Sequence, residues 1–466
     1  MSFLLLFFFS EFSLSAQVTF SLDSNGVTVK CTGCVAGNTG ILGGLTYTAH
    51  DNTSINAKPI GDTDWNRVVT SLVTDMSDLF LNQATFNQDI SSWDTSSVTT
   101  MKNMFSDASA FNQDIGDWDV SNVLNMQRTF YKAVAFNNGG SPSISTWDVS
   151  RVVNMYQMFF GASVFNQDIN LWDTSSVETM LGMFNGASAF DKPLNTWNVS
   201  SVTNMAGMFF DARVFDRPLN TWNVSSVTDM SQMFLNARAF DQDLSNWNVS
   251  SVRNMAQMFQ GAWAFNNDGI DSINNNWDTS SVTNMAGMFS NAKVFNQPLN
   301  NWNVSNVTNL NWTFQNAYKF NHDLSDWDTS SVTQMKATFL NARAFNKTLT
   351  RDGNKWNTSS VETMEDMFYG ARAFNQDIGS WDTSSVETMI DMFNGANSFN
   401  NYSSNSINNW DVSNVTNMAR MFLNAIAFNQ PLNNWNVSNV TSLQSTFSNA
   451  DSFNQPLNLW TTSSLL

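Results

Sequence analysis

Seven cationic or aromatic residues recur at steps of 25 to 30 residues and form what we call the basic-aromatic column. Interleaved cations and rings suit an extended anionic chain such as an acidic or sulfated polysaccharide. The cations pair with its charge and the rings stack on its sugar faces. The alternative is a solvated edge on which arginine stems cover the neighbouring rings. The seven residues are Arg213, Arg238, Trp263, Lys293, Tyr318, Arg343 and Arg372.

Four aspartates with a similar spacing form a second set, the acidic column. In register, neighbouring strands of a sheet lie about 4.8 Å apart, so stacked carboxylates would repel one another and calcium would relieve the repulsion. The alternative is a solvated acidic face, since no segment has the ligand spacing of a dedicated calcium loop. The four residues are Asp94, Asp119, Asp148 and Asp173.

Residues suited to catalysis are scarce. The chain has two histidines, His50 and His322, so histidine cannot supply a triad or a metal cluster. There is no glycine-rich phosphate loop. The carboxylates form a uniform ladder, whereas glycoside hydrolysis needs two carboxylates in different environments. We therefore predict that the protein is not an enzyme and needs no cofactor, calcium at the acidic column excepted.

Cys31 and Cys34 are the only cysteines and form a C-x-x-C pair. No second pair and no βαβ pattern accompany them, which argues against zinc binding and redox catalysis. In a secreted chain this spacing favours a small structural disulfide, with two free thiols as the next alternative.

Both columns belong to a 25-residue unit that occurs fifteen times between Val68 and Leu459, followed by a partial unit at 460–466. It reads W-[DN]-[VT]-S-[SN]-V-T-x-M-x-x-M-F-x-x-A-x-x-F-[ND]-x-x-[IL]-x-x. Numbered from its tryptophan, the acidic column is position 2 and the basic-aromatic column is position 17, about 30 Å long at the spacing of stacked strands. A fixed period of this length predicts a solenoid.

The apolar pattern within the unit predicts the structure of each coil. Trp222 and Val224, at positions 1 and 3, indicate a short strand, and Ser225 at position 4 suits the N-cap of a helix. Apolar residues at positions 6, 9, 12, 13, 16 and 19 then follow helical spacing. We therefore predict an α/β solenoid of about fifteen coils, each a short strand and a short helix.

Three positions predict the interior. Position 13 and position 19 are phenylalanine in all fifteen units, so stacked coils would form two phenylalanine ladders beside a tryptophan ladder. The first unit, at Val68, lacks its tryptophan. Position 20 is always asparagine or aspartate, and its side-chain oxygen would satisfy backbone groups of the tight return loop.

Four units, beginning at Trp118, Trp247, Trp327 and Trp381, are longer by four or five residues. Each insertion falls between the phenylalanine of position 19 and the next tryptophan, which places the insertions on one edge of the solenoid. These insertions are either sequence variation that the fold tolerates or loops that determine ligand specificity.

The segments before the repeats have a different character. Residues 1–16 contain a short apolar run and a small-x-small pattern, as in a secretory signal peptide. Residues 17–67 predict a β-rich N-terminal cap, with a hairpin around Asn25 and Gly26 and a strand over 44–51. No segment is long and apolar enough to predict a membrane span.

The charge balance limits the partners. The chain carries 39 acidic and 21 basic residues, a formal net charge of −18, which argues against nucleic acid and anionic membranes. The last unit is incomplete, and an open solenoid end invites self-association.

The repeat, for example Phe86 to Phe105, together with the leader NGVTVKCTGC, resembles the BspA-like leucine-rich-repeat surface proteins. This resemblance implies a right-handed solenoid, secreted or displayed on a cell surface and associated with adhesion, without catalytic residues. We expect a non-catalytic binding scaffold for extracellular protein or polysaccharide. The alternative is a structural protein whose ends assemble into filaments or a surface layer.

Overall fold

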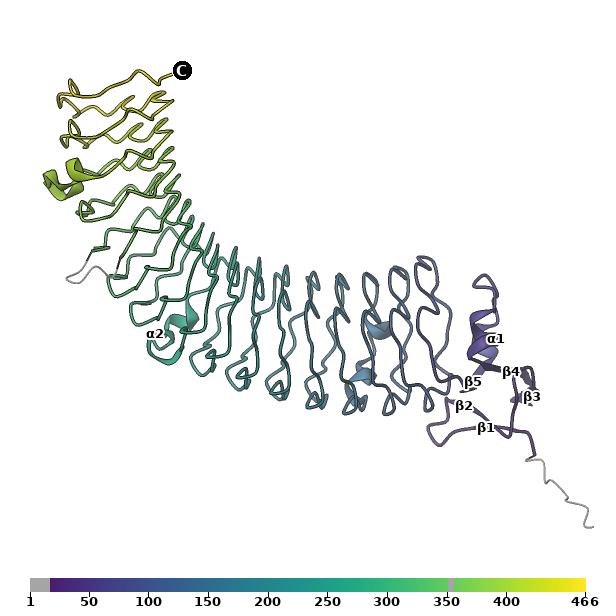
Figure 1. Ribbon diagram of the computed structural model, residues 1–466. Helices are drawn as coiled ribbons and strands as arrows, with labels where there is room; N and C mark the ends of the chain where they lie inside the picture. The colour runs from purple at the N-terminus through teal and green to yellow at the C-terminus, as the bar shows by residue number, and fades with distance from the viewer. Residues whose placement is uncertain (1–16, 351–355) are drawn as a thin grey trace, which may run out of the picture.

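The computed structural model describes residues 17–350 and 356–466. The repeats stack as successive coils of a solenoid, and the stack curves so that its last coils run at a steep angle to the first (Figure 1). The leader predicted at residues 1–16 lies outside the described residues.

The N-terminal cap is rich in strands. β1 and β2 pair as an antiparallel hairpin in which Leu22 faces Val29, so the hairpin expected around Asn25 and Gly26 is present. In a second sheet of order β3-β4-β5, β4 runs antiparallel to β3 and parallel to β5, which joins the cap to the first coil. The strands are β1 (Thr19–Leu22), β2 (Val29–Thr32), β3 (Thr39–Leu42), β4 (Leu45–Asp51) and β5 (Val68–Leu72).

Two short helices close the cap over the first coil. α1 (Asn52–Asn56) begins after Asp51, whose carboxylate accepts the backbone N–H of Ser54 while the Ser54 hydroxyl oxygen accepts the N–H of Asp51. This reciprocal capping box stabilises the first turn. η1 (Trp65–Arg67) places the Trp65 ring 6.0 Å from that of Trp93. Trp65 therefore supplies the ring that the unit at Val68 lacks.

The predicted short strand forms in the first coil, as β5, but the other described coils have neither the predicted strand nor the predicted helix. After β5, each coil forms a single parallel β-bridge to its neighbours at position 8, from Asp75 and Thr100 through to Ser442. The rest is a chain of tight turns in which the N–H groups at positions 9, 11, 13 and 15 donate to carbonyls of the next coil, as Met76 does to Thr100. The helices beyond the cap lie in the inserted loops.

Left-handed residues explain why no helix forms. Asp78 and Asn82, at positions 11 and 15, have φ of 62° and 60°, and these positions keep positive φ in most coils. Left-handed residues interrupt the i to i−4 hydrogen bonds of a helix. The three- and four-residue spacing of the apolar residues therefore reflects successive turns.

The serine at position 4 also has a different role from the predicted helix cap. The backbone N–H of Ser121 donates to Oδ1 of Asp119 at 3.0 Å, and its hydroxyl donates to the same atom at 2.6 Å. The same turn forms where position 2 is asparagine, as in Asn198 and Ser200. Positions 2 and 4 thus make an Asx turn in the units from Trp93 to Trp435, where position 2 is aspartate or asparagine.

The predicted aromatic ladders form the core. The position-13 rings of Phe105 and Phe130 lie 5.6 Å apart with 3° between their planes, and Trp222 and Trp247 stack at 6.4 Å. From Trp118 onward, each indole of the ladder also donates a hydrogen bond to the carbonyl of the Ile or Leu that comes before the tryptophan of the preceding unit, as Trp222 does to Leu194 at 2.8 Å. Because each ring packs on its neighbours, a coil buries its apolar face only within the stack.

The position-20 side chains satisfy the backbone as predicted. Oδ1 of Asn87 accepts the N–H of Asn112 at 2.9 Å, and Oδ1 of Asn112 accepts the N–H of Asn137 at 2.8 Å. This ladder continues to Asn454. It pairs one backbone donor per coil that the return loop would leave without a partner.

Three of the four insertions have similar folds at the same edge, on the outer side of the curve where α2 lies in Figure 1. In each, a fully buried asparagine accepts the N–H of position 23 of the coil before it: Asn138, Asn267 and Asn401. In all three loops, Nδ2 of this asparagine also donates to the carbonyl three residues later, so the loops are ordered parts of the fold. Their helices are η2 (Asn138–Gly140), η3 (Pro142–Thr146), η4 (Asn267–Gly269), α2 (Ile273–Asn276), η5 (Asn401–Ser403) and η6 (Asn405–Asn409).

Candidate functional site

Two groups of neighbouring side chains in the basic-aromatic column are in contact in the structure. Successive coils bring its side chains into contact, and Trp263 lies between two cations. The Cζ atom of Arg238 is 4.2 Å from the ring centroid and Nζ of Lys293 is 4.0 Å away. Further along, Cζ of Arg343 lies 4.7 Å from the ring of Tyr318.

These cations keep their charge available. In the described part of the chain, Arg238, Lys293, Arg343 and Arg372 form no ion pair with a carboxylate, and Arg213 lies 3.6 Å from Asp211. Rings hold a cation through their negative faces without neutralising it. The column therefore presents ordered positive charge on an acidic protein.

The same contacts leave the Trp263 ring less free to stack on a sugar than the sequence suggested. Trp263 is 40% exposed, but the cations approach it from the coils on either side. Its faces are thus covered by the protein's own side chains, as in the alternative interpretation of arginine stems over rings. Ligand contact at Trp263 would come through the cations, with the ring fixing their position.

The acidic column is a row of Asx turns. Asp119, Asp148 and Asp173 are exposed, and each accepts the N–H of the serine two residues on. Asp94 is buried and also accepts the hydroxyl of Ser71 at 2.6 Å. Hydrogen bonds from Ser150 lower the pKa of Asp148 below its usual value. Calcium binding here stays a prediction, and no group of three or more His, Cys, Asp or Glu side chains poised for a metal occurs among the described residues.

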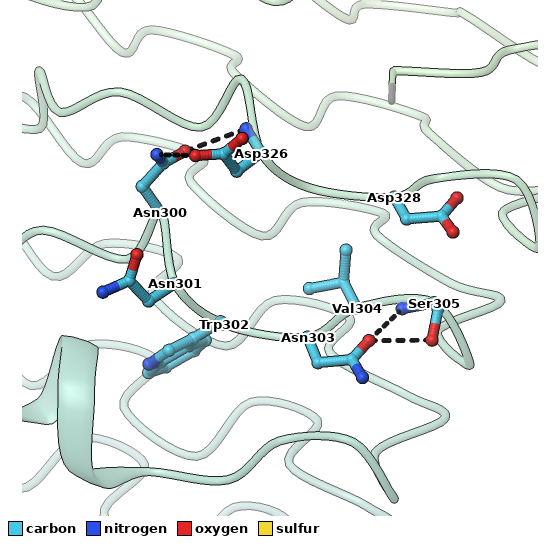
Figure 2. Close-up of a pocket in the computed structure, with 8 residues that line it drawn as sticks. All are labelled: Asn300, Asn301, Trp302, Asn303, Val304, Ser305, Asp326 and Asp328. Carbon is cyan, nitrogen blue, oxygen red and sulfur yellow. Dashed lines mark hydrogen bonds between the residues drawn. The ribbon is translucent and has the colours of Figure 1, made fainter. Parts of the chain in front are cut away.

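A groove of about 750 Å³ opens on another face, around residues 300–305 (Figure 2). Nδ2 of Asn300 donates to Oδ2 of Asp326 at 2.6 Å, and Oδ1 of Asn303 accepts the N–H of Ser305 at 3.0 Å. Asp328 also contributes to the wall, and the described residues of the lining include no cation. The amide and carboxylate lining distinguishes this groove from the basic-aromatic column.

A charged cluster at positions 10 and 11 was not foreseen. Arg420 holds Asp391 with Nη2 2.5 Å from Oδ2, and Lys336 pairs with Glu365 at 2.9 Å. Burial, together with the negative charges of Asp391 and Glu365, raises the pKa of the neighbouring Asp366 carboxyl to about 6. The acidic residues at position 11 of two successive units were the available signal.

A second cation and ring cluster lies nearer the N-terminus. Cζ of Arg128 is 5.2 Å from the ring of Tyr131 and 5.1 Å from that of Tyr156, while Lys132 lies over Tyr131 at 5.2 Å. Tyr131 also stacks on Phe160 at 4.8 Å. These residues occupy positions 10, 11, 14 and 15, where cations and rings do not recur in every unit.

Cys31 and Cys34 are joined as a disulfide within the cap, beside the hydrophobic cluster of Val29, Ala49 and Val69. No helix in the described part of the chain is long and apolar enough to cross a membrane.

Comparison with known proteins gives one clear result. The family described as "Mycoplasma protein of unknown function, DUF285" matches in six successive segments, at residues 45–142, 137–244, 193–274, 268–354, 348–406 and 401–466. No curated protein matches the chain. A crystal structure of a leucine-rich cell surface protein from Faecalibacterium prausnitzii A2-165 is similar over 94% of this chain and 92% of its own. The two chains are 12% identical, and their structures have a TM-score of 0.27. Because the family matches together extend from residue 45 to residue 466, the chain belongs to the DUF285 family.

Proposed function

We propose that this protein is a non-catalytic binding scaffold, secreted or displayed on a cell surface, whose basic-aromatic column binds an extended anionic polysaccharide. The leader-like residues 1–16 and the disulfide of the cap support a location outside the cytosol. A curved stack of similar coils offers a long repetitive surface, as binding solenoids do.

The position of Trp263 between Arg238 and Lys293 carries this proposal. A protein of net charge −18 has abundant carboxylates with which to neutralise surface cations. Here Arg238, Lys293 and Arg343 lie over rings instead, and the cations of the column recur at the spacing of the coils. Their charges therefore suit a ligand whose own negative charges repeat along a chain.

The test measures binding of a sulfated polysaccharide and of neutral dextran to the full chain. We expect binding of the sulfated polymer alone, weakened by on the order of tenfold in the double variant Arg238→Gln and Lys293→Gln, because exposed charge pairs contribute up to about 1 kcal/mol each.

A matched control separates the column from general charge. Arg151 and Arg253 are exposed at positions 5 and 7, outside the column. Replacing both by glutamine removes the same charge and should leave the affinity nearly unchanged. Equal weakening in the two double variants would refute a role for the column.

A further inference from the structure

A hollow lies at the C-terminal end of the basic-aromatic column, where coils 11 to 14 of the stack meet. It has a volume of about 480 Å³, within the range of small-molecule sites. Arg372, the last cation of the column, forms part of its wall. The other lining residues are Asn341, Tyr369, Gly370, Asn394, Gly395, Asn397 and Asn424.

Two glycines create this hollow. Position 15 carries an asparagine ladder in which Nδ2 of Asn341 donates to Oδ1 of Asn316 at 3.0 Å. The next two coils have Gly370 and Gly395 at that position, and the ladder resumes with Asn424. The two absent side chains leave the space that the hollow occupies.

The interruption also leaves an acceptor facing that space. A Cβ atom placed on Gly370 would lie 2.2 Å from Oδ1 of Asn341, so that oxygen points at the site of the missing side chain. Oδ1 of Asn341 is therefore directed into the hollow that the glycine leaves.

The lining combines groups that recognise an acidic sugar. Arg372 is exposed and, among the described residues, has no carboxylate partner, so its guanidinium is available to a carboxylate or sulfate. Asn341 and Asn397 offer amide groups to hydroxyls, and Tyr369, 37% exposed, offers a ring. The nearby carboxylate of Asp391 is already held by Arg420 and by Nδ2 of Asn394 at 2.7 Å.

We propose that this hollow binds one anionic sugar residue, a uronate or a sulfated monosaccharide, at the end of a polymer lying along the column. The proposal rests on the proposed function and adds to it a discrete subsite. The column supplies charge to many residues of the polymer, whereas the hollow selects a single ring by shape, hydroxyls and charge together.

The experiment is a calorimetric titration of the full chain with sodium glucuronate and with glucose. We expect glucuronate to bind with a dissociation constant on the order of 1 mM and glucose at least about tenfold more weakly. Arg372→Gln and Asn397→Asp should each weaken glucuronate binding about tenfold or more, the second by placing a carboxylate in the hollow. Both residues are exposed, and unchanged thermal melting would show that the variants fold.

Arg343→Gln is the matched control. Arg343 is the preceding cation of the column, lies over Tyr318 and does not line the hollow. The Arg343→Gln variant should bind glucuronate with the affinity of the wild type. Equal losses of glucuronate affinity in Arg343→Gln and Arg372→Gln would refute the subsite but not the binding role of the column. The absence of glucuronate binding by a protein that binds the sulfated polymer would have the same meaning. A third outcome is that glucuronate binding depends on Arg372 while polymer binding is unchanged by the loss of Arg238 and Lys293. That result would support the subsite in the hollow and refute the binding role of the column.

Discussion

The side-chain Oδ1 atom of Asn267 accepts a hydrogen bond of 2.9 Å from the backbone N–H of Leu244, in the preceding coil. Asn267 is fully buried, and its Nδ2 atom donates to the carbonyl of Ile270 at 2.6 Å. The insertion thus contributes a partner that the regular coil needs, so it is a structural feature of the solenoid as well as a surface loop.

Replacing Asn267 by alanine should therefore destabilise the protein by about 2 kcal/mol, because a buried N–H loses its partner. The midpoint of urea unfolding measures the effect. Asn275→Ala is the control, since Asn275 is exposed in the same insertion and should change stability by less than about 0.5 kcal/mol. Equal midpoints for the two variants would show that the buried bond is unimportant.

Asp366 should make stability depend on pH in the direction opposite to a paired carboxylate. Its pKa is raised from 3.8 to about 6, so between these values the folded protein binds the proton more tightly than the unfolded chain. This contribution is present below pH 3.8 and is lost as pH rises to about 6. Asp366→Asn should raise stability at pH 7.5 by about 1 kcal/mol, after allowance for solvent screening of a half-buried group.

The measurement for Asp366 is the difference in melting temperature between wild type and Asp366→Asn at pH 4.5 and at pH 7.5. Asparagine tolerates the left-handed backbone at this position, where φ is 58°. A stabilisation that appears at pH 7.5 and shrinks at pH 4.5 agrees with the raised pKa. The same difference at both values would contradict it.

Trp263 should contribute to binding by ordering its two cations. Trp263→Leu should weaken binding of a sulfated polysaccharide about two- to fivefold, which corresponds to the loss of cation–π contacts worth about 0.5 to 1 kcal/mol. Trp312→Leu is matched because Trp312 is also 40% exposed but lies at position 11, outside the column. If Trp263→Leu bound the sulfated polysaccharide with unchanged affinity, the ring would have no role in binding.

The acidic column can be tested for calcium directly. Each exposed carboxylate already accepts the N–H of its own serine, and asparagine makes the same bond in other coils. We expect Asp119→Asn with Asp148→Asn to leave the melting temperature nearly unchanged, with or without millimolar calcium. A rise of several degrees with calcium that disappears in this double variant would establish the cation site.

Much of the interior followed from the sequence because it depends on residues that repeat in every unit. Phenylalanine at positions 13 and 19 and asparagine or aspartate at position 20 form the predicted ladders. The prediction of a helix was wrong although residues such as Met230, Met233 and Phe234 have helical spacing. Position 15 carries glycine, as in Gly161 and Gly186, or asparagine in many units. That preference was the available signal for left-handed backbone.

The site was less predictable for a physical reason. The sequence located the basic-aromatic column, since its residues share position 17. It gave no sign that Arg238 and Lys293 would cover Trp263, because such contacts depend on side-chain conformations between coils. The hollow at Arg372 depends on residues missing from a ladder, and the ladder itself became visible only with the structure.

The most direct test of the central claim is the salt dependence of sulfated-polysaccharide binding, compared between wild type and the variant lacking Arg238 and Lys293. If ordered cations of the column bind the polymer, affinity should fall steeply with sodium chloride, and less steeply in the variant, because each lost contact removes a salt-sensitive charge pair. Identical slopes for the two proteins, or wild-type affinity that does not change with salt, would contradict the account.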